Sequence, residues 1–280
     1  MLRSVRVDYH LHLAPDGETL RDEHLSIEQL RRYVRTASDH GIGEIGLTEH
    51  VHRFRQAAAL SAHPFWQESA ESDLDEYHGL LAEARDDERL PLLVSLELDY
   101  LPGRESETAT LVTPYEWDYL LGAVHWLGDL AVDHPDWSVW AEASVDAVWE
   151  TYVETLVAAA ASGLFDVMAH PDLAKVFGDR PTAHLLPGLY ERATEAFATA
   201  GVVAELSTAG LRKGAEEIYP APAFLAALER AGVPISLASD AHTDEHIGWE
   251  FDRALRLAYD AGYRTVTQFR RRDQRQVSFV

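Results

Sequence analysis

Hydrophobic and polar residues alternate along this chain in two distinct patterns. Short apolar runs are separated by longer segments that have the spacing of amphipathic helices. The short runs predict strands at residues 5–12, 44–48, 92–98, 119–125, 165–169, 202–206 and 234–238. Strands that alternate with helices favour a parallel sheet in an α/β fold, and seven of them favour a barrel over an open sheet.

The predicted helices have ends that are marked by characteristic residues. Ser26 and Gln29 have the spacing of a capping box, and Gly41 ends that helix. Pro222 fits the first turn of a helix that Gly232 ends. Further helices are predicted at residues 73–87, 144–162, 186–200 and 250–261. No linker-like or repetitive segment divides the sequence, so we predict one domain over residues 1–280.

Histidines gather at the C-terminal ends of these predicted strands. Residues i and i+2 of a strand face the same side, so His10-Leu-His12 and Asp240-Ala-His242 each direct two metal-binding side chains toward one point. The histidines in such positions are His10, His12, His50, His125, His170 and His242. Imidazole and carboxylate groups bind divalent transition metals. Because barrel active sites form at this end of the strands, the pattern predicts a metal site there.

The number of candidate ligands exceeds what one ion needs. A single catalytic zinc takes three protein ligands, whereas these histidines are joined by Glu97 at the end of the third strand and by Asp240. We therefore predict two to three divalent metal ions. Glu97 is suited to bridge two of them, and such a pair can hold the attacking and leaving oxygens of a phosphoryl transfer. Glu49 and Asp172 fit outer positions that orient the ligands.

Composition excludes several classes of protein. With 280 residues, of which 46% are hydrophobic, the chain can bury a sizeable core. It has no cysteine, which excludes disulfides, thiolate metal sites and cysteine nucleophiles. A net charge of −23 argues against a nucleic-acid partner, since such binders need a basic surface. With no signal-like or membrane-spanning segment, we expect a cytoplasmic enzyme that acts on a small molecule.

These residues together resemble a known family. The ordered set His10-x-His12, Thr48-Glu-His50, Glu97, His125, His170 and Asp240-x-His242 resembles the PHP (polymerase and histidinol phosphatase) superfamily over essentially the whole chain. The resemblance implies a distorted (β/α)7 barrel with a trinuclear cluster, commonly of zinc, manganese or iron. The segment from Leu206 to Lys213, with Glu217-Ile-Tyr-Pro220 after it, is similar to the histidinol-phosphatase branch. That branch implies hydrolysis of L-histidinol phosphate in histidine biosynthesis.

Two motifs depart from the usual pattern of the superfamily. The second motif usually reads Thr-Asp-His, and here it has Glu49 in the middle position. The first motif usually supplies another ligand four to six positions after its second histidine, where this chain offers Asp16 or Glu18. Asp16 precedes a glycine, as in a common version of the motif, so we expect Asp16 to be the ligand. His24 is a more distant candidate.

The expected ligand set therefore comprises His10, His12, Asp16, His50, Glu97, His125, His170, Asp240 and His242. Asp240, His242 and His170 are candidates for the catalytic proton transfer, and the sequence does not choose among them. Arg212 and Lys213 are expected to bind the phosphate, since arginine offers a bidentate fork and lysine a point charge. Lys175, the other lysine of the chain, is an open case between site and surface. His52 is expected to contact the substrate.

Three other functions remain open at this point. A related phosphoesterase would act on another small phosphomonoester or a nucleotide diester. A metal-dependent amidohydrolase would also begin with a His-x-His motif, but the late Asp240-x-His242 pair and the lack of an obvious metal-bridging lysine argue against it. A non-catalytic metal-binding accessory domain would be expected to have lost ligands, and this set is nearly complete.

Overall fold

The computed structural model describes residues 6–21 and 23–280, so residue 5 of the first predicted strand lies outside the described part. Parallel strands form two sheets, ordered β1-β2-β3 and β10-β9-β8-β5-β4. Their bounds are β1 Arg6–Leu11, β2 Ile42–Leu47, β3 Leu92–Val94, β4 Glu97–Asp99, β5 Leu121–Ala123, β8 Val167–Met168, β9 Val203–Ser207 and β10 Ile235–Ala238. The predicted α/β fold with parallel strands is confirmed.

Backbone contacts join the two sheets near the C-terminal ends of their strands. Leu11 of β1 pairs with Ala241, which follows β10, and the amide of His12 donates to the carbonyl of Ala241 at 2.9 Å. On the other side, His50 after β2 pairs with Glu97 of β4. These pairings bring segments from both ends of the chain together at one place.

The third predicted strand is split in the structure. Residues 92–98 were expected to be continuous, but β3 pairs with β2 whereas β4 pairs with β5. Between them the Ser95 hydroxyl donates to the carbonyl of Tyr119 at 2.8 Å, and the amide of Leu121 donates to Leu96. The chain changes its pairing partner at Ser95 and Leu96. Both strands are buried, so the sequence shows one continuous apolar run and does not reveal the break.

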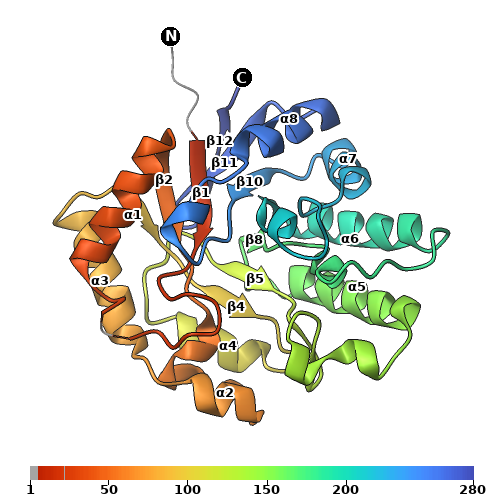
Figure 1. Cartoon of the computed structure of the whole chain (residues 1–280), viewed down its shortest axis with the longest axis horizontal. Coiled ribbons are helices and arrows are strands. Elements are labelled where there is room, and N and C mark those ends of the chain that lie inside the picture. Colours follow the sequence, from red (N-terminus) through yellow and green to blue (C-terminus); the bar gives the residue numbers. More distant parts are fainter. Residues whose placement is uncertain (1–5, 22) are drawn as a thin grey trace.

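The predicted helices are confirmed, and they lie around the outside of the strands (Figure 1). Ser26 accepts a hydrogen bond from the amide of Gln29. Gly41 follows that helix with φ of +77°, a backbone conformation that glycine adopts without strain. The bounds are α1 Ile27–Asp39, α3 Leu74–Asp86, α5 Val145–Ala161, α6 Leu186–Ala200, α7 Pro222–Arg230 and α8 Phe251–Ala261.

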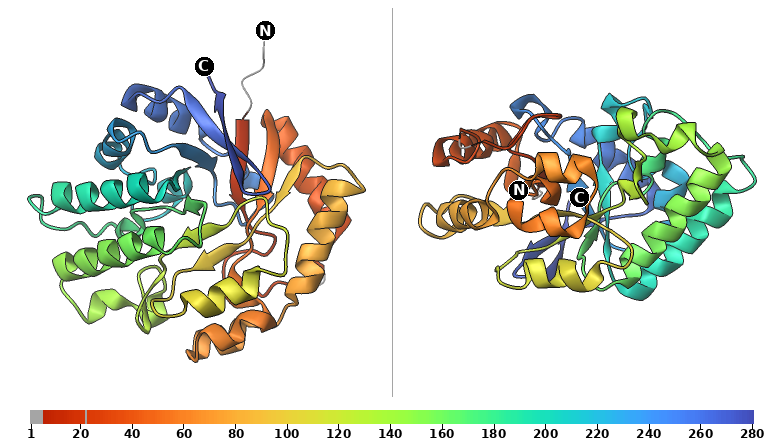
Figure 2. Two further views of the ribbon diagram at one scale, coloured as in Figure 1. Left: turned by 180° about the vertical axis from the view of Figure 1, so that it is seen from behind. Right: turned by 90° about the horizontal axis from the view of Figure 1, so that it is seen from below.

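Several short elements were not predicted. They are helices α2 Pro64–Ser69 and α4 Glu105–Val112, hairpin β6 Trp126–Leu127 with β7 Leu130–Ala131, and hairpin β11 Thr265–Arg270 with β12 Asp273–Ser278. The C-terminal hairpin lies beside β1 (Figure 2), where Phe269 packs on Tyr9 and Tyr119 with ring centroids 5.9 and 5.0 Å apart. None of the helices in the described residues combines the length and apolar character needed to cross a bilayer.

Candidate metal centre

The predicted ligands converge at the C-terminal ends of the strands. Within the described residues, donor atoms of three sets approach one another to within 4.8 Å. The sets share His10 and His12, so they form one continuous cluster. They are His12 with His50 and His242, His10 with His12 and Asp240, and His10 with Glu97 and His170.

His10 and His12 face each other in a way that a cation would explain. Their Nε2 atoms are 3.0 Å apart, while Nδ1 of His10 lies 2.6 Å from Glu205 and Nδ1 of His12 lies 3.3 Å from Glu49. A carboxylate accepts, so each Nδ1 is the donor. Burial lowers the pKa of both histidines, but neighbouring carboxylates raise it above its usual value, so the metal-free pair favours a positive charge between the two Nε2 atoms. Zinc–nitrogen bonds of about 2.0–2.1 Å would place two tetrahedral ligands roughly 3.3 Å apart.

Glu97 lies at the centre of the cluster. Its Oε1 is 3.1 Å from Nε2 of His170, and its Oε2 is 2.6 Å from Nδ1 of His50. Both Oε2 of Glu97 and Nδ1 of His50 are buried, and neither has a partner in hydrogen-bond geometry. Burial would raise the pKa of Glu97, but the surrounding histidines, His10 first, hold it well below its usual range. Glu97 is therefore a buried carboxylate anion whose oxygens meet nitrogens from several strands.

His125 joins the cluster from the far side of Glu97. Its Nε2 is 3.6 Å from Oε1 of Glu97, and its Nδ1 is 2.7 Å from Asp99. Burial lowers the pKa of His125, but the charges of Asp133, Asp99 and Glu97 raise it to about 10. The metal-free site thus favours a positive charge at His125, which a proton or a metal ion can supply.

Asp240 and His242 complete the cluster from the segment after β10. Oδ1 of Asp240 is 3.4 Å from Nε2 of His12 and 3.6 Å from Nε2 of His10. His242 lies 3.5 Å from His50 through their Nε2 atoms and 3.0 Å from Asp16. Asp240 has φ of +50° and His170 has φ of +23°, conformations that non-glycine residues rarely adopt and that often mark functional sites.

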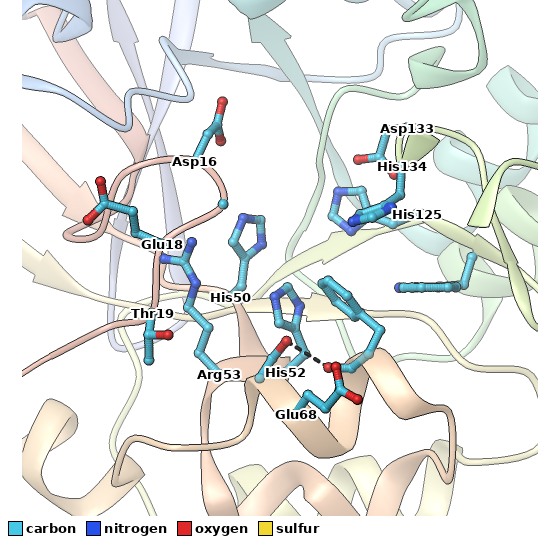
Figure 3. Close-up of a pocket in the computed structure, with 14 residues that line it drawn as sticks. Asp16, Glu18, Thr19, His50, His52, Arg53, Glu68, His125, Asp133 and His134 are labelled. Carbon is cyan, nitrogen blue, oxygen red and sulfur yellow. Dashed lines mark hydrogen bonds between the residues drawn. The ribbon is translucent and has the colours of Figure 1, made fainter. Parts of the chain in front are cut away.

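Asp16 and Lys213 meet above this side of the cluster. Oδ1 of Asp16 contacts His242, and its Oδ2 is 3.2 Å from Nζ of Lys213. Of the alternatives to Asp16, Glu18 turns its carboxylate away from His50 (Figure 3), and His24 accepts locally from the amide of Arg21. The structure thus brings Asp16, rather than Glu18 or His24, to a ligand histidine.

A cavity of about 280 Å³ opens beside the cluster (Figure 3). Its walls include His50, His125 and His52, so the cavity gives direct access to two of the predicted ligands. His52 lies with its Nδ1 3.7 Å from Asp99 and its ring 4.9 Å from that of Phe65. The predicted substrate contact of His52 agrees with this position in the wall.

Arg212 is held by backbone carbonyls next to the cluster. Its Nη2 donates to the carbonyls of Ser239 at 2.7 Å and of Asp240 at 3.0 Å, while its buried Nη1 has no partner among the described residues. An unpaired buried guanidinium donor costs free energy. It is suited to an anion bound at this edge of the cluster.

One expectation about a neighbouring residue was wrong, and the open case of Lys175 has a different answer from either alternative. Asp172 accepts from Lys175 and from the amide of Ala221, each at 2.8 Å, and does not orient the ring of His170. Lys175 is fully buried and also contacts Glu217 and the carbonyl of Ile218 at 2.8 Å. Asp172 and Lys175 therefore form a buried ion pair that is part of the fold, and the ammonium of Lys175 makes its contacts there.

Glu205 is a further candidate residue of the site, which the sequence pattern did not indicate. One of its oxygens lies 2.6 Å from Nδ1 of His10, and the other accepts from the amide of His170 at 2.6 Å. It thereby orients two ligands at once. The available signal was a lone carboxylate within the apolar run of residues 202–206.

Comparison with known proteins agrees with this geometry. The chain belongs to the PHP domain family, whose model matches residues 21–209. A Deinococcus radiodurans protein named as a probable histidinol-phosphatase is 34% identical over 247 residues, which covers 86% of this chain and 90% of that protein. The family resemblance found in the motifs is therefore confirmed.

Solved structures share the fold. A histidinol phosphate phosphatase from Lactococcus lactis subsp. lactis, complexed with zinc, L-histidinol and phosphate, aligns with a TM-score of 0.78 and 18% identity. The alignment covers 96% of this chain and 98% of that one. A second structure, from Listeria monocytogenes, aligns with a TM-score of 0.73 and 18% identity over 89% of this chain and 99% of that one.

Proposed function

We propose that this protein is a metal-dependent phosphatase that hydrolyses L-histidinol phosphate to L-histidinol and phosphate in cytoplasmic histidine biosynthesis. The observation that carries the proposal is the set of buried imidazole nitrogens and carboxylate oxygens that converge around Glu97. The Deinococcus radiodurans relative supports the choice of substrate. A single domain over residues 1–280 is part of the same proposal.

We further infer that the two sheets form one distorted (β/α)7 barrel. The Leu11–Ala241 and His50–Glu97 pairings support closure, because they join β1 to the segment after β10 and the segment after β2 to β4, at the ends that carry the predicted ligands. Such closure would hold the first and last motifs of the chain in a fixed relation.

The ligand set is sufficient for two or three divalent ions, such as zinc, manganese or iron. His10, His12, Asp16, His50, Glu97, His125, His170, Asp240 and His242 would hold them. Bound ions would neutralise charge on the phosphate and activate water, which phosphate monoester hydrolysis needs because it is among the slowest uncatalysed reactions.

The protein's own groups have separable tasks in this reaction. Arg212 would bind a phosphate oxygen through its unpaired Nη1, with Lys213 adding positive charge at the rim. Among the catalytic candidates, Asp240 has 17% of its side chain exposed, against 11% for His242 and 3% for His170. We assign the proton transfer to the carboxylate of Asp240, assisted by His242, because these groups border both the ligands and solvent. Asp240 would accept a proton from the attacking water and pass it to the oxygen of the leaving alcohol. His170 is enclosed and acts as a ligand.

A phosphate-release assay tests the proposal. Protein loaded separately with zinc, manganese or iron would be assayed with L-histidinol phosphate, p-nitrophenyl phosphate and bis-p-nitrophenyl phosphate. We expect the highest kcat/KM with L-histidinol phosphate. A preference for the aryl monoester or the diester would contradict the substrate, and metal-independent phosphate release would contradict the mechanism.

A further inference from the structure

The cavity beside the metal centre has an uneven distribution of charge. Its acidic lining residues are Asp16, Glu18, Glu68 and Asp133, and its one arginine or lysine is Arg53. The guanidinium of Arg53 is already taken by Glu49 and by the carbonyl of Pro15. An acidic cavity repels the phosphate of an ordinary ester, so its walls disfavour substrates that carry negative charge alone.

The acidic residues of the cavity differ in what they contact. Asp16 is engaged by His242 and Lys213. Glu18 turns away from His50, and Glu68 is exposed. The Asp133 carboxylate, by contrast, lies on the same side of the cavity as His125 (Figure 3) and is only partly exposed. No side chain or amide of the described residues forms a hydrogen bond or ion pair with it.

Asp133 is held at this place by the backbone. The amide of Val132 donates to the carbonyl of His125 at 2.9 Å, which fixes the next residue beside that predicted ligand. The hairpin β6–β7 connects His125 to Asp133, so both come from one short, ordered segment. The carboxylate is thus positioned beside the candidate metal centre, and within the described residues it forms no hydrogen bond or ion pair of its own.

Aromatic rings line the same end of the cavity. Phe65 and Trp126 have centroids 5.4 Å apart at 47°, and the ring of His134 lies 5.3 Å from Phe65. Phe65, Trp126, His134 and Asp133 all line the cavity. Flat apolar faces next to a carboxylate suit a ligand that combines a planar ring with a positive charge.

We propose that Asp133 binds the substrate's ammonium group, and that Phe65 and Trp126 hold its heteroaromatic ring. This inference rests on the proposed phosphatase function and specifies how it selects substrates. The enzyme accepts zwitterionic amino-alcohol phosphates, because the attraction between Asp133 and the ammonium group offsets the repulsion that the acidic cavity exerts on the phosphate. Phosphates that lack the ammonium do not gain this contact.

The test compares Asp133→Asn with wild type on two substrates. One is L-histidinol phosphate, and the other is 3-(imidazol-4-yl)propyl phosphate, which keeps the ring and the phosphate but lacks the amine. A charge-assisted contact predicts a loss of about ten- to a hundredfold in kcat/KM for L-histidinol phosphate, mainly through KM, and a change below about twofold for the other substrate. Asp136→Asn, an exposed change in the same loop, is the matched control and should behave as wild type.

Two results would overturn the inference. One is an equal change for both substrates in Asp133→Asn, including no change at all. The other is a loss of bound metal in Asp133→Asn, which would place Asp133 in the metal centre.

Calorimetry with metal-loaded protein separates this inference from the proposed reaction. L-histidinol should bind wild type more tightly than Asp133→Asn, and 3-(imidazol-4-yl)propan-1-ol should bind both equally. If wild type hydrolyses no phosphate but shows this binding difference, the inference is supported and the proposed reaction is contradicted. If wild type hydrolyses L-histidinol phosphate and Asp133→Asn does so equally well, the reaction is supported and the inference is overturned.

Discussion

The two ends of the parallel strands bury carboxylates in opposite ways. At the N-terminal ends, Asp118 accepts from the amide of Val94 at 2.9 Å and from Arg85 at 3.1 Å. Asp166 accepts from the amide of Leu120 at 2.7 Å and from Arg272 at 2.9 Å. At the C-terminal ends, Glu97 faces imidazole nitrogens, and one of its oxygens has no hydrogen-bond partner.

This difference separates residues that stabilise the fold from residues kept for chemistry. A buried polar atom without a partner costs about 1–3 kcal/mol. At the N-terminal ends, backbone amides and arginines avoid that cost. At the C-terminal ends, Oε2 of Glu97 bears this cost within the described residues. This is expected where metal ions and substrate supply the missing partners.

The largest effect is expected from Glu97→Gln, which keeps the size of the side chain and removes its charge. Residues that only orient ligands typically contribute ten- to a hundredfold in affinity or activity, so loss of the central ligand should lower kcat by more than about a hundredfold and reduce metal occupancy. Metal analysis and phosphate release measure both. Asp166→Asn, at the other end of the strands, is the control and should keep its metal. Full metal content with wild-type turnover in Glu97→Gln would remove Glu97 from its central role.

Arg212→Ala should lower kcat/KM by about ten- to a hundredfold, because a charge-assisted hydrogen bond to phosphate is lost. Metal content should stay the same, since Arg212 contacts carbonyls and not ligand atoms of the cluster. Arg212→Lys should recover only part of the activity. Lys213→Ala should have a smaller effect, because Lys213 is 42% exposed and already pairs with Asp16. An Arg212→Ala enzyme with unchanged kcat/KM would contradict the phosphate contact.

Asp99→Asn should weaken metal binding by about tenfold or more while retaining activity at saturating metal. Asp99 lies 2.7 Å from Nδ1 of His125 and thereby directs Nε2 toward Glu97. Competition with a chromophoric chelator measures the change in affinity. Glu105→Gln, at the start of α4, is the control, since its carboxylate accepts from Tyr100, the residue after Asp99. Equal metal affinities in both variants would show that His125 needs no such orientation.

The smallest effect is expected at the N-terminal ends. Arg272→Ala removes the contacts with Asp166 and the carbonyl of Leu164. Because Arg272 is 42% exposed, the free energy of unfolding should fall by only about 1 kcal/mol, with metal content and kcat unchanged. Chemical denaturation measures this against Arg275→Ala, an exposed change in the same hairpin. Loss of metal in Arg272→Ala would show that the two ends are coupled.

Much of the site could be predicted because strand periodicity is regular. The i, i+2 spacing of His10 and His12 is enough to place both rings on one face at the end of β1. Asp240 and His242 follow β10, and Asp240 has φ of +50°, so this pair reaches the cluster without the strand geometry that its spacing predicted. The helix ends at Ser26 and Pro222 were predictable because capping depends on neighbouring residues alone.

The rest depends on contacts between distant residues. Glu205 and His10 are 195 positions apart, and sequence periodicity carries no information about such a pair. Lys175 could not be assigned, because its burial depends on Glu217, on a later loop. The C-terminal hairpin was missed since most residues of β12 are exposed and polar, so it lacks the apolar run by which the other strands were recognised.

The central claim is that the C-terminal ends of the strands form a multinuclear metal centre that hydrolyses phosphate. The most direct test is to titrate metal-free protein with zinc or manganese while measuring phosphate release from L-histidinol phosphate. A multinuclear centre predicts that activity is absent without metal and reaches a plateau at two to three bound ions per chain. Full activity with one bound ion, or with none, would contradict it.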